Sequence, residues 1–441
     1  MVTRKQFNLG MIATGLGGGM AADPSAAQER PQPATNLPTT PSAPGQTSYF
    51  FKNSAFEFVF LASLGRAYHQ GGNVGKVLHV IRQVEDGNFE SAWQALIAAG
   101  DEARGMAEES QAGGHAESAR QAYLWAQNFY DGATYFADGT GDPSRVKAAW
   151  QMMDDCWLKS LPLFDPPIEQ VSIPYEGTAL RGFYFRGRST KAQRPLLILV
   201  NGSDGSALDM WTMGGAGAVA RGYDCLTFDG PGQGYALWKQ GLYFRPDWER
   251  VVTPVVDFAL GLAGVDPKRI AIQGISQGGY WVPRAVAFEK RIAAAIADPG
   301  VVDVSSSWTA ALPPPLLELL KAGRKAEFDG FMGKALDTAA KNALAFRMRP
   351  YGATSYYDAF RAAMEYDLTS VAGQIECPML ITEPANEAFW PGQSRRLHDL
   401  LTCPRTLVPF SAADGADLHC EPKGYGLRDL RVFNWLDKIL A

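Results

Sequence analysis

The chain contains 441 residues and carries a formal net charge of −5, which is ample length for one large core with an accessory domain. The negative charge, with no basic stripe interleaved with aromatic residues, argues against a nucleic-acid partner. None of the five cysteines has C-x-x-C spacing, so the sequence indicates neither a zinc site nor a redox motif, and we expect no metal and no cofactor.

The N-terminal residues predict a targeting signal rather than part of the fold. Thr3–Leu9 contains an Arg-Lys pair followed by Phe, and a short glycine-rich apolar segment leads to the small residues Ser25–Ala27. This pattern is typical of a relaxed twin-arginine signal peptide, and its apolar run is too short for a transmembrane helix. We therefore predict a signal peptide over residues 1–27, a Pro-rich linker over 28–47 and a periplasmic or secreted protein rather than a cytoplasmic one.

Residues 48–165 are predicted to form a helical cap domain. Glu90–Glu109 and Ala116–Phe136 carry apolar residues at intervals of three and four, and a Gly-Gly pair separates the two segments. Pro166-Pro167 marks the boundary, after which residues 166–441 are predicted to form the catalytic domain.

The sequence of residues 166–441 predicts an α/β fold with a doubly wound, mostly parallel sheet. Gln170–Pro174 and Ala179–Arg186 indicate an opening β-hairpin, and strands and helices then alternate. The alternation stops between Val304 and Val371, a stretch rich in Pro, Ala and aromatic residues. We expect this stretch to be a lid inserted into the sheet domain.

The sequence Gly274-Ile275-Ser276-Gln277-Gly278 follows an apolar strand and precedes a predicted helix. Strand, turn and helix in this order are the context of a G-x-S-x-G nucleophile elbow. The glycines provide room for a sharp turn that lifts the Ser276 hydroxyl clear of the sheet. The backbone N–H of Gln277, at the start of the helix, is then placed to bind an oxyanion. We predict Ser276 as the nucleophile.

A serine nucleophile needs a general base, and the chain has five histidines. Three of them lie in the helical first third, and His398 falls in a predicted polar helix. His419 follows the apolar strand Thr406–Phe410 through a loop. In α/β-hydrolases the triad runs in the chain order serine, acid, histidine, with the histidine after the last strand. His419 is therefore the predicted base.

The acid is expected between Ser276 and His419, in the loop after the strand Cys377–Thr382. Glu387 stands a few residues before a proline, at the offset where many hydrolases carry aspartate. A glutamate can accept the imidazole Nδ1–H equally well. Glu383, nearer the strand end, and Asp303, in an earlier loop, are alternatives, and Glu387 is preferred.

Two further loops are expected to contribute to the site. The most apolar strand, Pro195–Val200, runs into Asn201–Ser206, and the N–H of Ser203 or Asp204 is predicted to be the second oxyanion donor. Arg245 and Trp248 follow the fourth strand and are candidates for contacting a substrate oxygen and ring. The glycine-rich turn between these segments lacks the spacing of a phosphate-binding loop.

From about residue 50 onward the chain resembles a group of α/β-hydrolases that contains 2,6-dihydroxypseudooxynicotine hydrolase and the fungal yellowish-green pigment hydrolases. The resemblance implies cleavage of carbon–carbon bonds next to a ketone in aromatic or polyketide-like compounds, beneath an N-terminal helical domain. Glu387 departs from the aspartate that the group carries there. The segments that carry the resemblance, besides the elbow, are Ala119–Leu124, Asn128–Tyr130, Asn201–Gly205, Asp229–Gly234, Phe244–Glu249 and Asp414–Cys420.

Together these features predict a cofactor-free serine hydrolase acting on a small aromatic or acyl-ketone molecule by carbon–carbon or ester hydrolysis. A carboxylesterase or a prolyl-oligopeptidase-like peptidase is the alternative within this class, because the triad is indifferent to the leaving group. A catalytically dead hydrolase scaffold that binds a ligand is the alternative from another class. We expect no integral membrane span, and the sequence leaves open whether the chain forms a homodimer.

Overall fold

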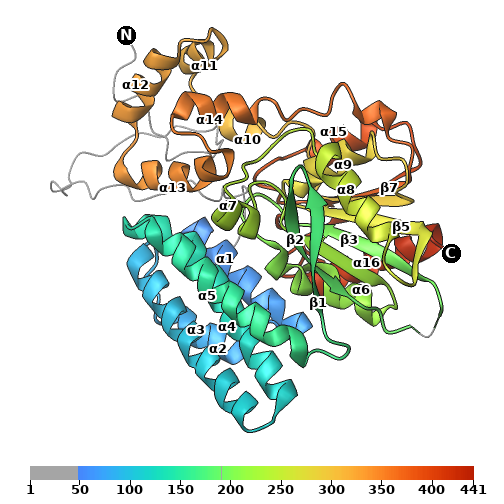
Figure 1. The fold of residues 1–441 in the computed structure, drawn as a ribbon. Coiled ribbons are helices and arrows are strands. Elements are labelled where there is room, and N and C mark those ends of the chain that lie inside the picture. The colour runs from blue at the N-terminus through green and yellow to red at the C-terminus, as the bar shows by residue number, and fades with distance from the viewer. Residues whose placement is uncertain (1–47, 190) are drawn as a thin grey trace.

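The computed structural model describes residues 48–189 and 191–441, so the predicted signal peptide (1–27) and linker (28–47) lie outside the described residues (Figure 1). Within the described residues, eight strands form one sheet in the order β1-β2-β4-β3-β5-β6-β7-β8. The strands are β1 (Glu169–Tyr175), β2 (Thr178–Phe185), β3 (Arg194–Val200), β4 (Asp224–Phe228), β5 (Val265–Ile275), β6 (Ala294–Asp298), β7 (Met379–Pro384) and β8 (Arg405–Phe410).

The sheet is antiparallel at one edge and parallel elsewhere. β1 and β2 form the predicted hairpin, with Tyr175 opposite Thr178, and β2 also runs antiparallel to β4. All pairs from β4–β3 to β7–β8 are parallel. The mostly parallel sheet with flanking helices confirms the predicted fold class.

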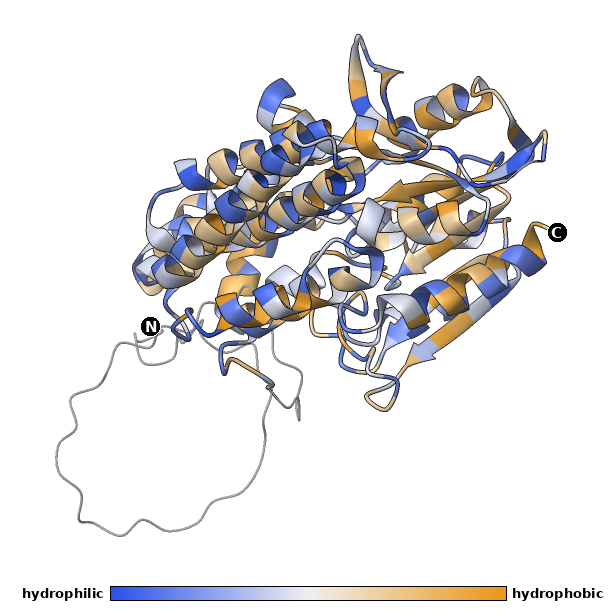
Figure 2. Ribbon diagram, turned by 90° about the horizontal axis from the view of Figure 1, so that it is seen from below, coloured by the Kyte–Doolittle hydropathy of each residue, from blue (hydrophilic) through white to orange (hydrophobic). Residues whose placement is uncertain are grey.

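Both faces of the sheet are buried, which explains why its central strands are almost continuously apolar. Along β3, Leu197 and Leu199 point into one hydrophobic cluster, whereas Leu196, Ile198 and Val200 point into the other. Figure 2 shows strands that are largely hydrophobic and helices in which hydrophobic and hydrophilic residues alternate. This is the two-residue period expected of a strand covered on both sides.

Helices that connect the strands cover each face. The cluster on one face includes residues of α8, α9 and α15, and the cluster on the other includes residues of α6 and α16. The bounds of the helices that connect and cover the strands are α6 (Ala216–Ala220), α7 (Gly234–Gln240), α8 (Glu249–Leu260), α9 (Gly278–Val286), α15 (Gln393–Leu400) and α16 (Tyr425–Ile439).

The predicted helical region is a bundle that lies beside the sheet (Figure 1). Its core is continuous with one sheet face, where the Trp157 ring lies 5.5 Å from that of Phe183. In the described part of the chain, no helix is both long and apolar enough to cross a membrane. The helices are α1 (Ser54–Gly65), α2 (Val74–Ile81), α3 (Phe89–Ala112), α4 (Ala116–Ala137) and α5 (Ser144–Ser160), with short 3₁₀ turns such as η2 (Arg66–His69) and η3 (Asp138–Thr140) between them.

The predicted lid forms a separate group of helices between β6 and β7, with a small hydrophobic cluster of its own. It is tied to the helical region at two points. Arg349 pairs with Asp138 at 2.7 Å, and the rings of Tyr135 and Phe346 lie 6.0 Å apart. The helices are α10 (Ser306–Thr309), α11 (Pro314–Lys321), α12 (Lys325–Ala335), α13 (Thr338–Met348) and α14 (Tyr356–Ala363).

Candidate active site

Ser276 lies in a strained turn between β5 and α9. Its backbone has a φ of 57°, in the left-handed region that side chains other than glycine rarely adopt. The flanking glycines are required by space: a Cβ on Gly274 would lie 2.0 Å from Gly278 O, and one on Gly278 would lie 3.0 Å from Val200 O. The Ser276 N–H donates to Asp298 O at 2.6 Å. This geometry is that of a nucleophile elbow.

His419 bridges Ser276 and Glu387. Its Nε2 lies 2.9 Å from Ser276 Oγ, a distance at which the hydroxyl donates to the ring nitrogen, and its Nδ1 lies 2.7 Å from Glu387 Oε2. The other oxygen, Glu387 Oε1, accepts the N–H groups of Phe389 at 2.8 Å and Trp390 at 3.0 Å. The three side chains therefore have the arrangement in which histidine can take a proton from serine while a carboxylate orients its ring.

The negative charge of Glu387 is stabilised by its hydrogen-bond partners. Burial works to raise the pKa of this carboxyl, but His419 and the two N–H groups outweigh burial, so the pKa lies below its usual value. The carboxylate consequently stays ionised and can accept the Nδ1–H of His419.

The alternative acids lie elsewhere. Glu383 pairs with Arg395 at 2.7 Å, and the Asp303 carboxylate accepts the N–H and hydroxyl of Ser305. His398 contacts its neighbour Asp399 on α15. The structure thus brings only the preferred members of the expected set to Ser276, as far as the described residues show.

The loop after β3 passes directly over Ser276. A Cβ on Gly202 would lie 2.5 Å from Ser276 Cβ, so this position must be glycine. Ser203, Asp204 and Gln277 line the same pocket as Ser276. These are the residues expected to provide oxyanion N–H groups, and the loop and the helix start face one pocket.

The pocket wall comes from three parts of the chain: the helical region, the lid, and the loops at the carboxyl ends of the strands. Phe58 of α1 reaches His419, with ring centroids 6.4 Å apart. Many of the lining side chains are apolar or aromatic, among them Phe58, Val59, Phe89, Tyr135, Phe136, Met213, Trp308, Phe346, Tyr351, Phe389 and Trp390. Such a wall suits a compact, largely apolar ligand.

Arg245 and Trp248 do not line this pocket, which corrects the expectation that they contact substrate. Arg245 is held by Glu176, Asp247 and the Tyr175 hydroxyl. Trp248 is fully buried and stacks on the Trp281 ring, with centroids 4.4 Å apart. Position after a strand end in the sequence does not determine where a side chain points: ion pairs place Arg245, and packing places Trp248.

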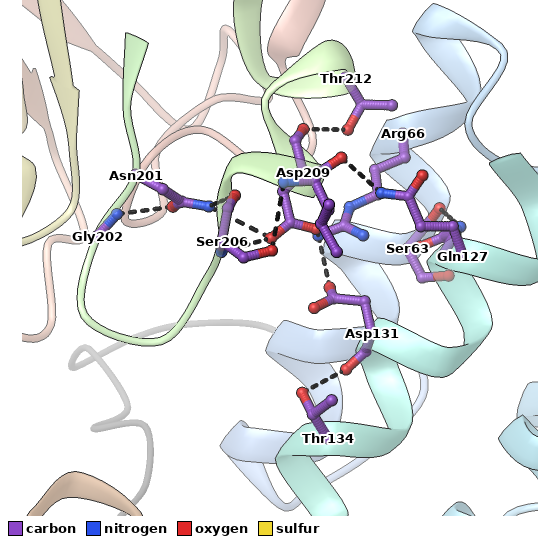
Figure 3. Close-up of polar contacts among 12 residues, drawn as sticks. Ser63, Arg66, Gln127, Asp131, Thr134, Asn201, Gly202, Ser206, Asp209 and Thr212 are labelled. Atoms are coloured by element: carbon purple, nitrogen blue, oxygen red, sulfur yellow. Dashed lines mark hydrogen bonds and ion pairs between the residues drawn. The ribbon is translucent and has the colours of Figure 1, made fainter. Parts of the chain in front are cut away.

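A buried ion network joins the helical region to the loop over Ser276 (Figure 3). Arg66 Nη2 lies 2.6 Å from Asp131 Oδ2 and 3.3 Å from Asp209 Oδ1. Burial and then the Asp131 carboxylate raise the pKa of Asp209, although Arg66 opposes them. Nearby, Gln127 Nε2 donates to Leu208 O at 2.5 Å. Two helices of the bundle therefore hold the segment that follows the loop.

Asp209 also forms a hydrogen bond with the loop that follows β3. Its Oδ2 accepts the Ser206 N–H at 3.0 Å, and Asn201 Nδ2 donates to Ser206 O at 2.7 Å. Asn201 Oδ1 in turn accepts the Gly202 N–H at 2.7 Å (Figure 3). The backbone over Ser276 is thus set by hydrogen bonds that begin at Arg66.

Replacing Arg66 by methionine is expected to lower the free energy of unfolding by about 3–5 kcal/mol, because two buried carboxylates lose their counter-charge. Urea unfolding measures this loss. Arg104→Met is the matched control: Arg104 pairs with Asp101 at the surface of the same bundle, so its loss is expected to stay below about 1 kcal/mol. Equal effects of the two substitutions would contradict the role given to Arg66.

The sequence analysis missed Arg66, Asp209 and Arg347 among the residues that line the pocket. No local motif marks them, since each comes from an element that is distant from Ser276 along the chain. The aromatic residues of the lid were indicated only by the aromatic-rich composition of that stretch. Within residues 48–189 and 191–441, no cluster of His, Cys, Asp and Glu side chains is suited to hold a metal ion, and all five cysteines are free.

Comparison with known proteins identifies relatives over most of the chain, although no family model matches it. The chain is 32% identical over 415 residues to the hydrolyase poxO of Penicillium oxalicum, covering 89% of this chain and 98% of that protein. It is 28% identical over 416 residues to the 20-hydroxy-prefusarin hydrolase FUS2 of Gibberella moniliformis, covering 89% and 98%.

A solved structure shares the fold. The 2,6-dihydroxy-pseudo-oxynicotine hydrolase superposes with a TM-score of 0.63 at 21% identity, over 86% of this chain and 95% of that one. The nucleophile-elbow geometry, the mostly parallel sheet and the helical region agree with these similarities. The chain is therefore a hydrolase that belongs to the α/β-hydrolase family of these fungal hydrolases, and it shares its fold with 2,6-dihydroxy-pseudo-oxynicotine hydrolase.

Proposed function

We propose that this enzyme is a serine hydrolase that uses Ser276 as nucleophile, His419 as general base and Glu387 as orienting acid. The backbone N–H groups of Gln277 and of Ser203 or Asp204 bind the oxyanion of the tetrahedral intermediate. The substrate is a small aromatic or acyl-ketone molecule, and the bond that is cleaved is a carbon–carbon bond or an ester.

The observation that carries the proposal is the pair of contacts made by His419, at 2.9 Å to Ser276 Oγ and 2.7 Å to Glu387 Oε2. With this geometry His419 accepts the hydroxyl proton while Ser276 attacks a carbonyl carbon. The proton is then delivered to the leaving group, and water releases the acyl group from Ser276 by the same route in reverse.

The pocket supports the proposed substrate class. Its aromatic wall is assembled from the helical region and the lid as well as the catalytic loops, which favours compact molecules over folded proteins or polymers. One relative, FUS2, is named for hydrolysis of 20-hydroxy-prefusarin, and the fold neighbour for hydrolysis of 2,6-dihydroxy-pseudo-oxynicotine.

The reaction is tested with a panel of aryl esters, anilides and 1,3-diketones, together with labelling by a fluorophosphonate probe. We expect labelling of Ser276 and turnover of diketones and esters. Turnover of esters or anilides without any diketone would favour the carboxylesterase or peptidase alternative. Failure of the probe to label Ser276, with no turnover of any substrate, would favour a binding protein on a dead scaffold.

We also propose that the enzyme is exported, on the basis of the Arg-Lys pair and the short apolar segment within residues 1–27. In a bacterial host with an intact twin-arginine system, hydrolase activity is expected in the periplasmic fraction. Replacing Arg4 and Lys5 by glutamine is expected to retain the activity in the cytoplasm. An unchanged distribution of activity between the two fractions would refute the signal.

A further inference from the structure

The lid places an arginine in the wall of the pocket. Arg347 lies near the end of α13 and lines the same pocket as Ser276 and His419. Its guanidinium carbon sits 4.5 Å from the centre of the Trp308 ring, and Nη2 donates to Ser307 Oγ at 3.0 Å. Both contacts come from the lid itself and hold the side chain in position.

The charge of Arg347 is not neutralised by a contacting carboxylate from any described residue. Arg66, which also lines the pocket, is by contrast paired with Asp131 and Asp209. Burial lowers the pKa of Arg347, and Asp204 only partly offsets this effect. Because guanidinium remains protonated in proteins and carries five N–H groups, Arg347 is a half-buried cation with free donors in the wall of the pocket that also contains Ser276.

An unpaired cation that is half-buried in an apolar pocket wall is favoured when a ligand supplies an oxygen that carries negative charge. The Asp204 carboxylate lines the same pocket and disfavours a ligand that is already an anion when it enters. A neutral ligand that becomes negatively charged during the reaction satisfies both constraints. Interactions that strengthen as charge develops are those that accelerate a reaction.

From this arrangement we infer that Arg347 binds the enolate oxygen of the leaving group when the enzyme cleaves a neutral 1,3-diketone. The inference rests on the proposed function, with Ser276 as the nucleophile. Arg347 is then the residue that suits this site to carbon–carbon cleavage, because an enolate is a far poorer leaving group than the alkoxide or phenolate of an ester.

The atoms balance as follows. Ser276 Oγ bonds to one carbonyl carbon and its proton passes to His419. When the tetrahedral intermediate collapses, the carbon–carbon bond breaks and its electron pair moves into the enolate, whose oxygen faces Arg347. His419 returns the proton to the enolate carbon, which yields a ketone. Water then adds to the acyl group, the bond to Ser276 Oγ breaks, and a carboxylic acid leaves.

The test compares two substrates on the full-length enzyme. Cleavage of benzoylacetone releases an enolate as the leaving group. Cleavage of nitrophenyl acetate releases a phenolate, which is a stable anion without a bound cation. Arg347→Gln is expected to lower kcat for benzoylacetone by on the order of 10²–10³, the usual effect of removing one oxyanion donor. Its kcat for the ester is expected to fall less than tenfold. Arg347→Lys keeps the charge and is expected to restore part of the diketone rate.

Arg361→Gln is the matched control, because it removes an exposed arginine from the same lid, and we expect both rates to be unchanged. The ester rate of each variant reports whether the pocket is intact.

Equal losses on both substrates, no loss on either, or a change confined to KM for benzoylacetone would each overturn the inference while the proposed hydrolase stands. If the wild-type enzyme is labelled by fluorophosphonate and cleaves the ester but no diketone, carbon–carbon hydrolysis fails and the inference fails with it.

Discussion

Replacing Ser276 by alanine is expected to lower kcat by about 10⁶, the loss seen when a triad nucleophile is removed. Without Oγ there is no atom to form the acyl intermediate, and His419 has no proton to accept. The fold is expected to persist, because alanine is smaller than serine and leaves the turn between β5 and α9 with the same backbone. Turnover of the best substrate in the panel measures the first effect, and thermal unfolding measures the second.

Ser370→Ala, at an exposed position, is the control for this variant and is expected to retain wild-type turnover. Activity of Ser276→Ala within tenfold of wild type would remove the basis for the proposed mechanism. Loss of fluorophosphonate labelling in Ser276→Ala alone would identify the modified residue directly.

Replacing Glu387 by glutamine is expected to lower kcat by about 10⁴, the precedent for a triad acid that becomes an amide. Glu387 now accepts three hydrogen bonds, from His419 Nδ1 and from two backbone N–H groups. An amide has one acceptor oxygen, so the two N–H groups compete with His419 for it. If the amide NH₂ faces His419, the proton of the ring moves to Nε2, and Ser276 loses its base.

Glu387→Asp keeps the charge and is expected to retain more activity than Glu387→Gln. Glu383→Gln and Asp303→Asn are the matched controls, and both are expected to stay within tenfold of wild type because their carboxylates bond to Arg395 and Ser305. If one of these controls loses activity by about 10⁴ and Glu387→Gln does not, the acid has been assigned to the wrong residue.

The sequence was most informative for features that are formed by residues close to one another along the chain. The elbow around Ser276 depends on residues within a few positions of one another: a Cβ on Gly274 would clash with Gly278 O at 2.0 Å, and one on Gly278 would be tight against Val200 O at 3.0 Å. The strands of the sheet were also predictable, because burial on both faces requires continuous apolar runs.

Side-chain direction was not predictable from position along the chain. Arg245 and Trp248 follow a strand end, as Asn201 and Gly202 do, yet they pack away from the pocket. An arginine beside Glu176 and Asp247 bonds to them, and a tryptophan beside an apolar helix is buried with it. Both outcomes also depend on distant residues, Glu176 for Arg245 and Trp281 for Trp248.

By itself, the sequence determined the elbow, the chain order of serine, acid and histidine, and the class of fold, because each follows from short-range spacing or from the period of apolar residues. Only the tertiary structure decided which carboxylate meets His419, and that Arg66 and Arg347 reach the pocket. The physical reason is distance along the chain. The helical region and the lid contribute to one pocket through contacts between segments that are hundreds of residues apart, and no local pattern records such contacts.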